Sequence, residues 1–402
     1  MRVLICPDSF GGTLSAPDVA EALAAGWQAA RPDDELAQLP LSDGGPGLLD
    51  VLEAALPGSR LHARAVQDPL GRPVSGHWLR HGDTAYIESA QACGLHLLAE
   101  PERDPGRTTT YGVGELIRGA LDAGARRVMV GLGGSGTNDG GAGLLASLGL
   151  TGYDAAGARL PPGGLALAEI VALLGTLDPL GTLDPLDPLD PLDPLGTEAA
   201  LDTLDPLGTE GADVELVAAT DVDAPLLGPY GASAVFGPQK GASPAQVQAL
   251  DAALTCWADV VEQHLGVSAR ELPGAGAAGG LGFALLALGA HRRAGFDVVA
   301  DAVGLTARIA AVDLVITGEG SFDASSLTGK VVSGVAARAA RQCIPCVVLA
   351  GQVSVAADQA TNAGVGAAYS LAAAVGLERA LAEPYAGLVL LAGRVAGQWP
   401  QP

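Results

Sequence analysis

Six acidic side chains of this chain stand in short segments rich in glycine: Asp8, Asp43, Asp139, Asp221, Glu319 and Asp323. Carboxylates of this kind hold Mg²⁺ and accept protons from hydroxyl groups. Phosphoryl transfer needs both tasks, together with cations that face the phosphates. The pattern therefore favours phosphoryl-transfer chemistry. For each residue taken singly, helix capping or turn formation is an equally good interpretation, because aspartate does both routinely.

Lysine is rare in this chain, and its positions are informative. Of the 22 basic residues, only Lys240 and Lys330 are lysine, and glycine flanks both. A compact, movable ammonium group suits a phosphate where a rigid guanidinium does not fit. We therefore expect both lysines to contact nucleotide or transferred phosphate. The alternative is that they are surface residues without a role.

The segment from Gly131 to Gly143 contains seven glycines and precedes a predicted helix. Glycines allow the backbone to approach an anion, and a helix start offers free N–H groups. The segment is not a Walker A motif, because no Gly-Lys-Ser/Thr ends it. We nevertheless expect it to cradle phosphates. The residues assigned to nucleotide binding are Gly133, Gly134, Ser135, Thr137, Asn138 and Lys330.

The elements that must position these segments alternate between strand and helix. Strands are predicted at 3–6, 36–39, 127–131, 216–219 and 313–317, and a glycine-rich polar segment follows each. Helices are predicted at about 15–30, 111–123, 244–265 and 331–341. Such alternation indicates a parallel sheet covered by helices, whose ligands bind beyond the carboxyl ends of the strands. Strands at 60–67, 74–80 and 84–88 indicate an additional antiparallel region.

A low-complexity tract lies at about 175–211, where Leu-Asp-Pro recurs with three-residue spacing from Leu183 to Pro194. Repeated proline cannot continue a helix or occupy a central strand. We expect a surface loop without a catalytic role.

Composition excludes several other classes of protein. A net charge of −23 without a basic stripe argues against nucleic-acid binding. No apolar run approaches the roughly 20 residues of a membrane helix, and no signal peptide is recognisable. Five scattered cysteines do not suggest a disulfide framework. We expect a cytoplasmic protein with small-molecule partners and without nucleic-acid or membrane partners; its oligomeric state is not indicated.

These segments together resemble the bacterial type I glycerate kinase family, over almost the whole chain. The most specific matches are Gly133-Gly-Ser-Gly-Thr-Asn-Asp-Gly-Gly-Ala-Gly143 and Ala234-Val-Phe-Gly-Pro-Gln-Lys-Gly241. Further matches are Asp43-Gly-Gly, Glu88-Ser-Ala, Thr109-Thr-Tyr-Gly-Val-Gly-Glu-Leu-Ile117, Gly276-Ala-Ala-Gly-Gly280 and Leu314-Val-Ile-Thr-Gly-Glu-Gly320. The resemblance implies transfer of phosphate from ATP to D-glycerate with Mg²⁺, and 2-phosphoglycerate as the product.

The resemblance also implies an α/β fold in two parts: a flavodoxin-like parallel α/β domain and a mixed α/β domain inserted into it. We expect residues 1–65 and 290–402 to form the first domain and 66–289 the second, with the active site between them. A kinase of this fold for another small hydroxy acid, and a non-catalytic protein that binds a nucleotide or metabolite, remain alternatives.

Site roles are assigned on this basis. Expected catalytic residues are Asp43, Asp221 and Lys240, with one aspartate acting as base and the other helping to hold Mg²⁺. Expected substrate-binding residues are Asp8, Ser9, Gly44, Gly45 and Glu319. Expected metal ligands are Asp139, Asp221 and Asp323. Two positions depart from the family pattern, because relatives often have lysine at Gly11 and glutamate at Pro46.

Overall fold

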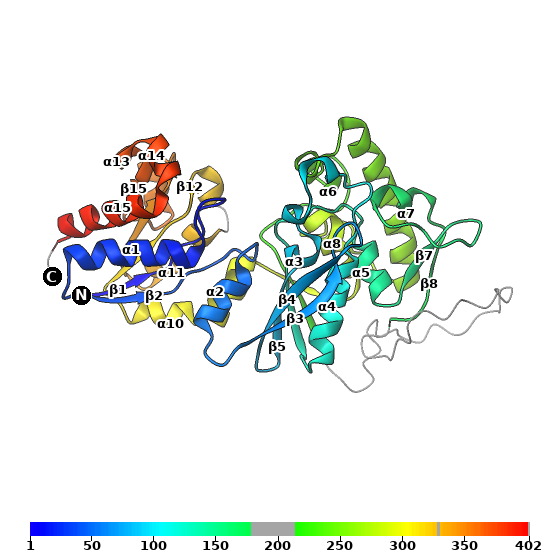
Figure 1. Ribbon diagram of the computed structural model, residues 1–402, viewed down its shortest axis with the longest axis horizontal. Helices are drawn as coiled ribbons and strands as arrows, with labels where there is room; N and C mark the ends of the chain where they lie inside the picture. Colours follow the sequence, from blue (N-terminus) through cyan, green and yellow to red (C-terminus); the bar gives the residue numbers. More distant parts are fainter. Residues whose placement is uncertain (178–213, 328–329, 401–402) are drawn as a thin grey trace.

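A computed structural model describes residues 1–177, 214–327 and 330–400 of the chain. The protein has two lobes, each built around its own β-sheet, and both termini lie in the same lobe (Figure 1). The expected loop at 175–211 falls almost entirely outside the described residues. None of the helices within the described ranges is long and apolar enough to span a membrane.

The first lobe contains a five-stranded sheet in which every pair of neighbouring strands is parallel. Its order is β15 (Ala367–Ser370), β13 (Cys346–Ala350), β11 (Leu314–Thr317), β1 (Arg2–Ile5) and β2 (Glu35–Gln38). Numbered along the chain within this sheet, the strands run 2-1-3-4-5, which is the order of flavodoxin. The predicted flavodoxin-like domain is therefore confirmed.

Helices cover both faces of this sheet. On one face lie α1 (Ala16–Ala30) and α15 (Pro384–Gln398); on the other lie α2 (Leu48–Ala55), α9 (Gly295–Ala302), α10 (Leu305–Ala310) and α11 (Val331–Arg341). Helix α1 corresponds to the helix predicted at about 15–30. Ser15 accepts a hydrogen bond from the Asp18 N–H, and the Asp18 side chain accepts one from the Ser15 N–H, which forms a capping box. Short helices α12 (Ala357–Asn362), α13 (Leu371–Val375) and α14 (Leu377–Ala382) complete the lobe.

The second lobe contains a six-stranded mixed sheet. Strands β3 (Arg60–Gln67), β4 (Pro73–His81) and β5 (Thr84–Glu88) are antiparallel, whereas β5, β6 (Arg127–Gly131), β9 (Glu215–Ala219) and β10 (His291–Arg293) are parallel. One face packs against α4 (Tyr111–Asp122), α5 (Ala142–Ser147), α7 (Pro244–Leu265) and α8 (Ala277–Ala287). Other elements of this lobe are α3 (Ala90–Cys93), α6 (Ala232–Phe236) and the strand pair β7 (Thr151–Tyr153) with β8 (Ala172–Leu174). The pair of β12 (Ser321–Phe322) with β14 (Gln352–Val353) belongs to the first lobe.

A single apolar cluster joins the two lobes. It takes Leu4 and Val315 from the parallel sheet and Tyr86, Met129 and Val217 from the mixed sheet, with α2 and α9 between them. Alternation along β5 explains this sharing, because Tyr86 faces the common cluster while its neighbours Ala85 and Ile87 face the other side. The lobes therefore meet through buried apolar side chains.

The pairing of strands bears on the expected domain limits. All of β3, through Gln67, pairs with β4, and β10 pairs with β9. The expected limit at residue 65 thus falls inside β3, and the limit at residue 290 falls just before β10, so both would divide the mixed sheet. We propose limits at about residues 59 and 294, which leave each sheet whole.

Candidate active site

Three of the expected site carboxylates follow neighbouring strands of the parallel sheet. Asp8 follows β1, Asp43 follows β2 and Glu319 follows β11. Backbone hydrogen bonds continue beyond the strand ends, since the N–H of Asp8 donates to Gly318 O (2.8 Å) and that of Leu41 donates to Pro7 O (2.9 Å). The three carboxylates therefore gather at the carboxyl edge of the sheet.

A cleft opens at this edge. One part has a volume of about 650 Å³ and the other about 460 Å³, and both are lined by Asp8, Ser9, Gly11, Thr13 and Asp43. The smaller part adds Glu319, Asp323 and Lys330 on one side. It also has an apolar wall, formed by Leu377 and Leu381 of α14, which are 52% and 60% exposed. Sequence analysis did not find this apolar wall, because isolated exposed leucines have no distinctive pattern.

Asp221 comes from the other lobe, where it follows β9. Its Oδ1 accepts a hydrogen bond from the Gly295 N–H (3.0 Å), while its Oδ2 is buried and accepts none from the described residues. Asp221 lies near Asp43, and the two expected catalytic aspartates are thus brought together where the lobes meet. Neither part of the cleft includes Asp221 among its described lining residues.

The proximity of these carboxylates changes their protonation. Burial, then the charges of Asp43 and Glu319, raises the pKa of Asp8 to about 7. Burial, then the charge of Asp43, raises the pKa of Asp221 to about 7. Burial also raises the pKa of Glu319. Removal of water and mutual repulsion both disfavour the charged forms of these carboxylates. A bound cation would therefore stabilise their charged forms.

Lys330 is the only cation among the described residues that line either part of the cleft. Its Nζ donates to Ser325 Oγ at 3.2 Å. Hydrogen bonds from Ser325, followed by the charge of Lys330, lower the pKa of Asp323. Asp323 and Lys330 therefore lie together near Glu319.

Most polar groups of the glycine-rich segment face inward. Thr137 and Asn138 are fully buried, and Asn138 Nδ2 donates to Ser233 Oγ (2.9 Å). Lys240 is also buried, and its Nζ donates to Ser135 Oγ (2.9 Å) and Thr137 O (2.7 Å). Burial lowers the pKa of Lys240 to about 8. Thr137 Oγ1 and Asn138 Oδ1 are buried and have no hydrogen-bond partner among the described residues, and within 133–139 only Gly133 and Gly134 are accessible.

Asp139 is similarly occupied. One carboxylate oxygen accepts hydrogen bonds from the Thr110 N–H and hydroxyl and the Gly143 N–H, and the other accepts from the Gly141 N–H. Asp139 fastens the start of α4 to the glycine-rich segment. The structure does not bring it to Asp221 or Asp323, so the three expected metal ligands lie apart.

Gly44 and Gly45 lie where the lobes touch. A Cβ added to Gly131 would lie 2.2 Å from Gly44 O, and one added to Gly133 would lie 2.5 Å from Gly45 Cα. The Gly44 N–H donates to Ser42 Oγ (3.1 Å), and the Gly45 N–H donates to Asp43 Oδ1 (3.0 Å). These glycines permit close backbone approach, and their N–H groups are already bonded.

Glu88 received no individual role from the sequence. It ends β5 and accepts a hydrogen bond from the Gly47 N–H (3.0 Å) at the start of α2, so it links the mixed sheet to the loop that carries Asp43. Burial raises its pKa to about 7. The signal available was its place in Glu88-Ser-Ala directly after a predicted strand.

The donor chemistry of the cleft fits Mg²⁺, although the described residues contain no ready-made group of three side chains that could hold a metal ion. Carboxylate oxygens are the protein ligands that Mg²⁺ prefers. Two of them, Asp221 Oδ2 and Glu319 Oε1, are buried without a hydrogen-bond partner in the described part of the chain. A cation among these carboxylates would offset their repulsion.

Comparison with known proteins decides the family. The model of the glycerate kinase family matches residues 3–180 and 191–400. The chain belongs to the glycerate kinase family. The interruption of the match, at 181–190, falls within the Leu-Asp-Pro tract. Glycerate kinases are phosphotransferases with an alcohol acceptor, so the predicted enzyme class agrees with the family.

Individual relatives agree along nearly their whole length. The chain is 41% identical to glycerate kinase of Bacillus subtilis over 92% of this chain and 90% of the relative. It is 38% identical to glycerate 2-kinase of Escherichia coli over 94% and 92% of the two chains. A crystal structure of a proposed glycerate kinase 2 from Salmonella typhimurium superposes with a TM-score of 0.77 at 38% identity, covering 98% of this chain and 97% of the other.

Proposed function

We propose that this glycerate kinase family member transfers the γ-phosphoryl group of ATP to the 2-hydroxyl of D-glycerate. The observation that supports this most directly is a cleft lined by Asp8, Asp43, Glu319 and Lys330 together with exposed leucines, with Asp221 near Asp43. Similarity to a relative named glycerate 2-kinase supports the 2-phosphate as the product.

The lining residues of the cleft suit the two ends of ATP. Leu377, Leu381 and Pro384 suit the base, and Lys330 suits the phosphates. Asp43, Asp221 and Glu319 would hold Mg²⁺, which when bound neutralises phosphate charge. D-glycerate would lie beside Asp8 and Ser9, which line both parts of the cleft.

Asp8 is the residue best placed to accept the proton of the glycerate hydroxyl. It lines both parts of the cleft, and its pKa of about 7 matches the value at which a general base works best near neutral pH. Asp221, which the sequence suggested as base or metal ligand, lies near Asp43 but is not among the described residues that line the cleft, and it suits the ligand role. Lys240, expected to act in catalysis, would instead position the glycine-rich segment from within.

The test is which hydroxyl of glycerate carries the phosphate in the product. Purified protein is incubated with ATP, Mg²⁺ and D-glycerate, and the product is offered to enolase with and without phosphoglycerate mutase. Direct consumption by enolase supports the 2-phosphate, whereas dependence on the mutase shows the 3-phosphate. A panel of other small hydroxy acids tests the alternative acceptors, and failure to turn over ATP with any of them would favour a binding protein. A cytoplasmic location stays a prediction.

A further inference from the structure

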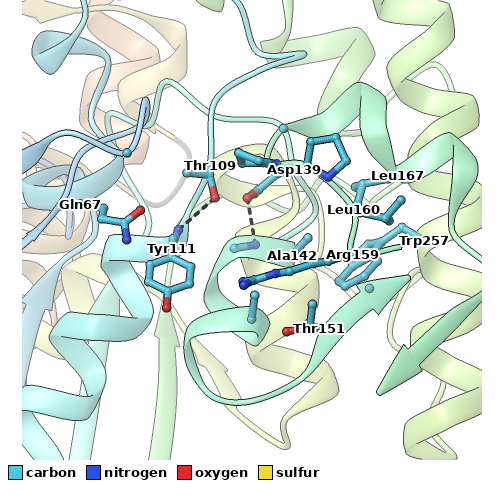
Figure 2. A pocket seen from close by; sticks show the side chains of 17 residues that line it. Gln67, Thr109, Tyr111, Asp139, Ala142, Thr151, Arg159, Leu160, Leu167 and Trp257 are labelled. Carbon is cyan, nitrogen blue, oxygen red and sulfur yellow. Dashed lines mark hydrogen bonds between the residues drawn. The ribbon is translucent and has the colours of Figure 1, made fainter. Parts of the chain in front are cut away.

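A second cavity lies on the far side of the glycine-rich segment, away from the cleft. It has a volume of about 470 Å³ and shares no described lining residue with the cleft. Its walls come from the starts of α4 and α5, from β7 and the chain that follows it, and from α7 (Figure 2). The volume lies within the range of cavities that bind small organic molecules.

The cavity is mainly apolar. Ala146 of α5, Leu160, Leu167 and Trp257 of α7 form much of its surface, and Pro161 and Pro162 add to it. Trp257 is 1% exposed and is fixed by its indole N–H, which donates to Gly140 O at 2.9 Å. Such walls favour a flat or branched apolar body.

One unpaired cation faces this apolar space. Only Asp139 and Arg159 carry charge among the described lining residues. Figure 2 shows the Arg159 guanidinium extending into the pocket beside Ala142. No hydrogen bond or ion pair joins the Arg159 side chain to another described residue. Its backbone is held, because Arg159 bridges to Tyr153 and the next N–H, that of Leu160, donates to Gly152 O (2.9 Å).

Asp139, the other charged lining residue, forms no ion pair with Arg159. Its two oxygens already accept hydrogen bonds from Thr110, Gly141 and Gly143. A guanidinium without a carboxylate partner, at the edge of an apolar cavity, selects an anion with planar oxygens. A nucleoside triphosphate does not suit the site, because one cation would leave most of its charge unpaired.

We propose that this cavity is a second ligand site, separate from the catalytic cleft, which binds an organic acid with one negative group on Arg159 and an aromatic or branched apolar body against Leu160, Leu167 and Trp257. Gln67, Thr109 and Thr151 supply hydrogen-bonding groups at its rim. The site stands on its own geometry and does not depend on the proposed reaction.

The test uses 1-anilinonaphthalene-8-sulfonate, which joins one anion to an aromatic body, and N-phenyl-1-naphthylamine, which has the same rings without the anion. Both are titrated into the full-length protein by fluorescence. We expect saturable binding of the sulfonate at one site, and displacement by 1-naphthoate. Arg159→Gln should weaken sulfonate binding about tenfold or more, the loss expected for one charged hydrogen-bonded contact, and change binding of the neutral probe less than about twofold.

Two further variants locate the effect. Ala146→Phe fills the cavity and should weaken both probes, whereas Arg126→Gln removes an exposed arginine elsewhere and should weaken neither. The proposal is overturned if the wild-type protein shows no saturable sulfonate binding. It is also overturned if Arg159→Gln binds the sulfonate as tightly as the wild type, or if Arg126→Gln weakens it equally. Because Arg159 is exposed, its variant should fold normally.

Discussion

Asp43 and Asp221 follow strands of different sheets, yet both lie against Gly295. The Gly295 N–H donates to Asp221 Oδ1 (3.0 Å), and a Cβ added to Gly295 would lie 1.8 Å from the carbonyl oxygen of Asp43. No other residue type allows this approach, because any side chain would collide with the Asp43 backbone. The junction between the lobes therefore gathers acidic charge into a small volume.

That charge should make the metal-free protein less stable as pH rises. The pKa values of Asp8 and Asp221 rise from 3.8 to about 7 on folding, so the folded state binds protons more tightly than the unfolded chain. The stabilisation is fully present below about pH 4 and is lost as pH rises through 7. In EDTA, the melting temperature at pH 5.5 should therefore exceed that at pH 8 by a few degrees. Each kcal/mol of stability shifts the melting temperature by on the order of 2 °C.

Asp221→Asn should reduce this pH dependence, since asparagine keeps the Oδ1 acceptor and removes the charge. Asp313→Asn is the matched control, because hydrogen bonds from Arg2 lower the pKa of Asp313 and place its titration below this pH range. An equal slope of melting temperature against pH in wild type and Asp221→Asn would contradict the assignment.

The same two aspartates should matter for turnover. Asp43→Asn and Asp221→Asn should each fold and lower kcat/KM by roughly 10²-fold or more, the scale of a lost charge contact in a transition state. The dependence on Mg²⁺ distinguishes a carboxylate that holds the metal from one that does not. A higher Mg²⁺ concentration should restore part of the activity only where the substituted residue is a metal ligand. We expect such rescue for Asp43→Asn and Asp221→Asn and none for Asp8→Asn. Wild-type kinetics in both of the first two variants would exclude them from the site.

The sequence predicted elements better than it predicted the direction of side chains. The helix predicted at 244–265, which Ser243 caps, and the strand predicted at 60–67 are observed as α7 (Pro244–Leu265) and β3 (Arg60–Gln67). Helix caps and the periodicity of apolar residues depend only on residues close together in the chain, so they can be recognised in a single sequence. The flavodoxin-like order came from the family resemblance.

The glycine-rich segment shows why the rest was harder. Glycines beside Thr137, Asn138 and Lys240 have the same sequence pattern whether the polar groups face a phosphate or one another. In the structure Lys240 Nζ donates to Ser135 Oγ and Thr137 O, and Asn138 Nδ2 donates to Ser233 Oγ. Thr137 Oγ1 and Asn138 Oδ1 are buried without a hydrogen-bond partner among the described residues. Hydrogen bonds between the lobes, such as that from the Gly47 N–H to Glu88, join distant parts of the chain. They therefore leave no local sequence pattern.

Replacing each lysine by arginine should separate a buried positioning role from a role at the cleft. Lys240 is 2% exposed, and arginine has no space or partners there for its larger group. Lys240→Arg should lower stability by about 1–3 kcal/mol through overpacking and lower activity as well. Lys330→Arg, which keeps a cation in an open cleft, should retain most activity and a normal melting temperature. Calorimetry and steady-state kinetics on both variants provide the comparison, and the reverse ranking would place Lys240 rather than Lys330 at the phosphates.

Gly11 offers a gain-of-function test of the same electrostatics. It lines both parts of the cleft, a Cβ added there meets no atom within 4 Å, and its φ is not among the positive values, unlike that of Gly12 at +79°. Gly11→Lys should therefore be accommodated and add a cation beside Asp8 and Asp43, where Lys330 is otherwise the only described cation. We expect a KM for ATP lowered by roughly threefold to tenfold at low ionic strength, an effect that salt should diminish. Gly11→Met provides the uncharged control of similar length. Equal kinetics in the lysine and methionine variants would show that charge at this position does not reach the bound nucleotide.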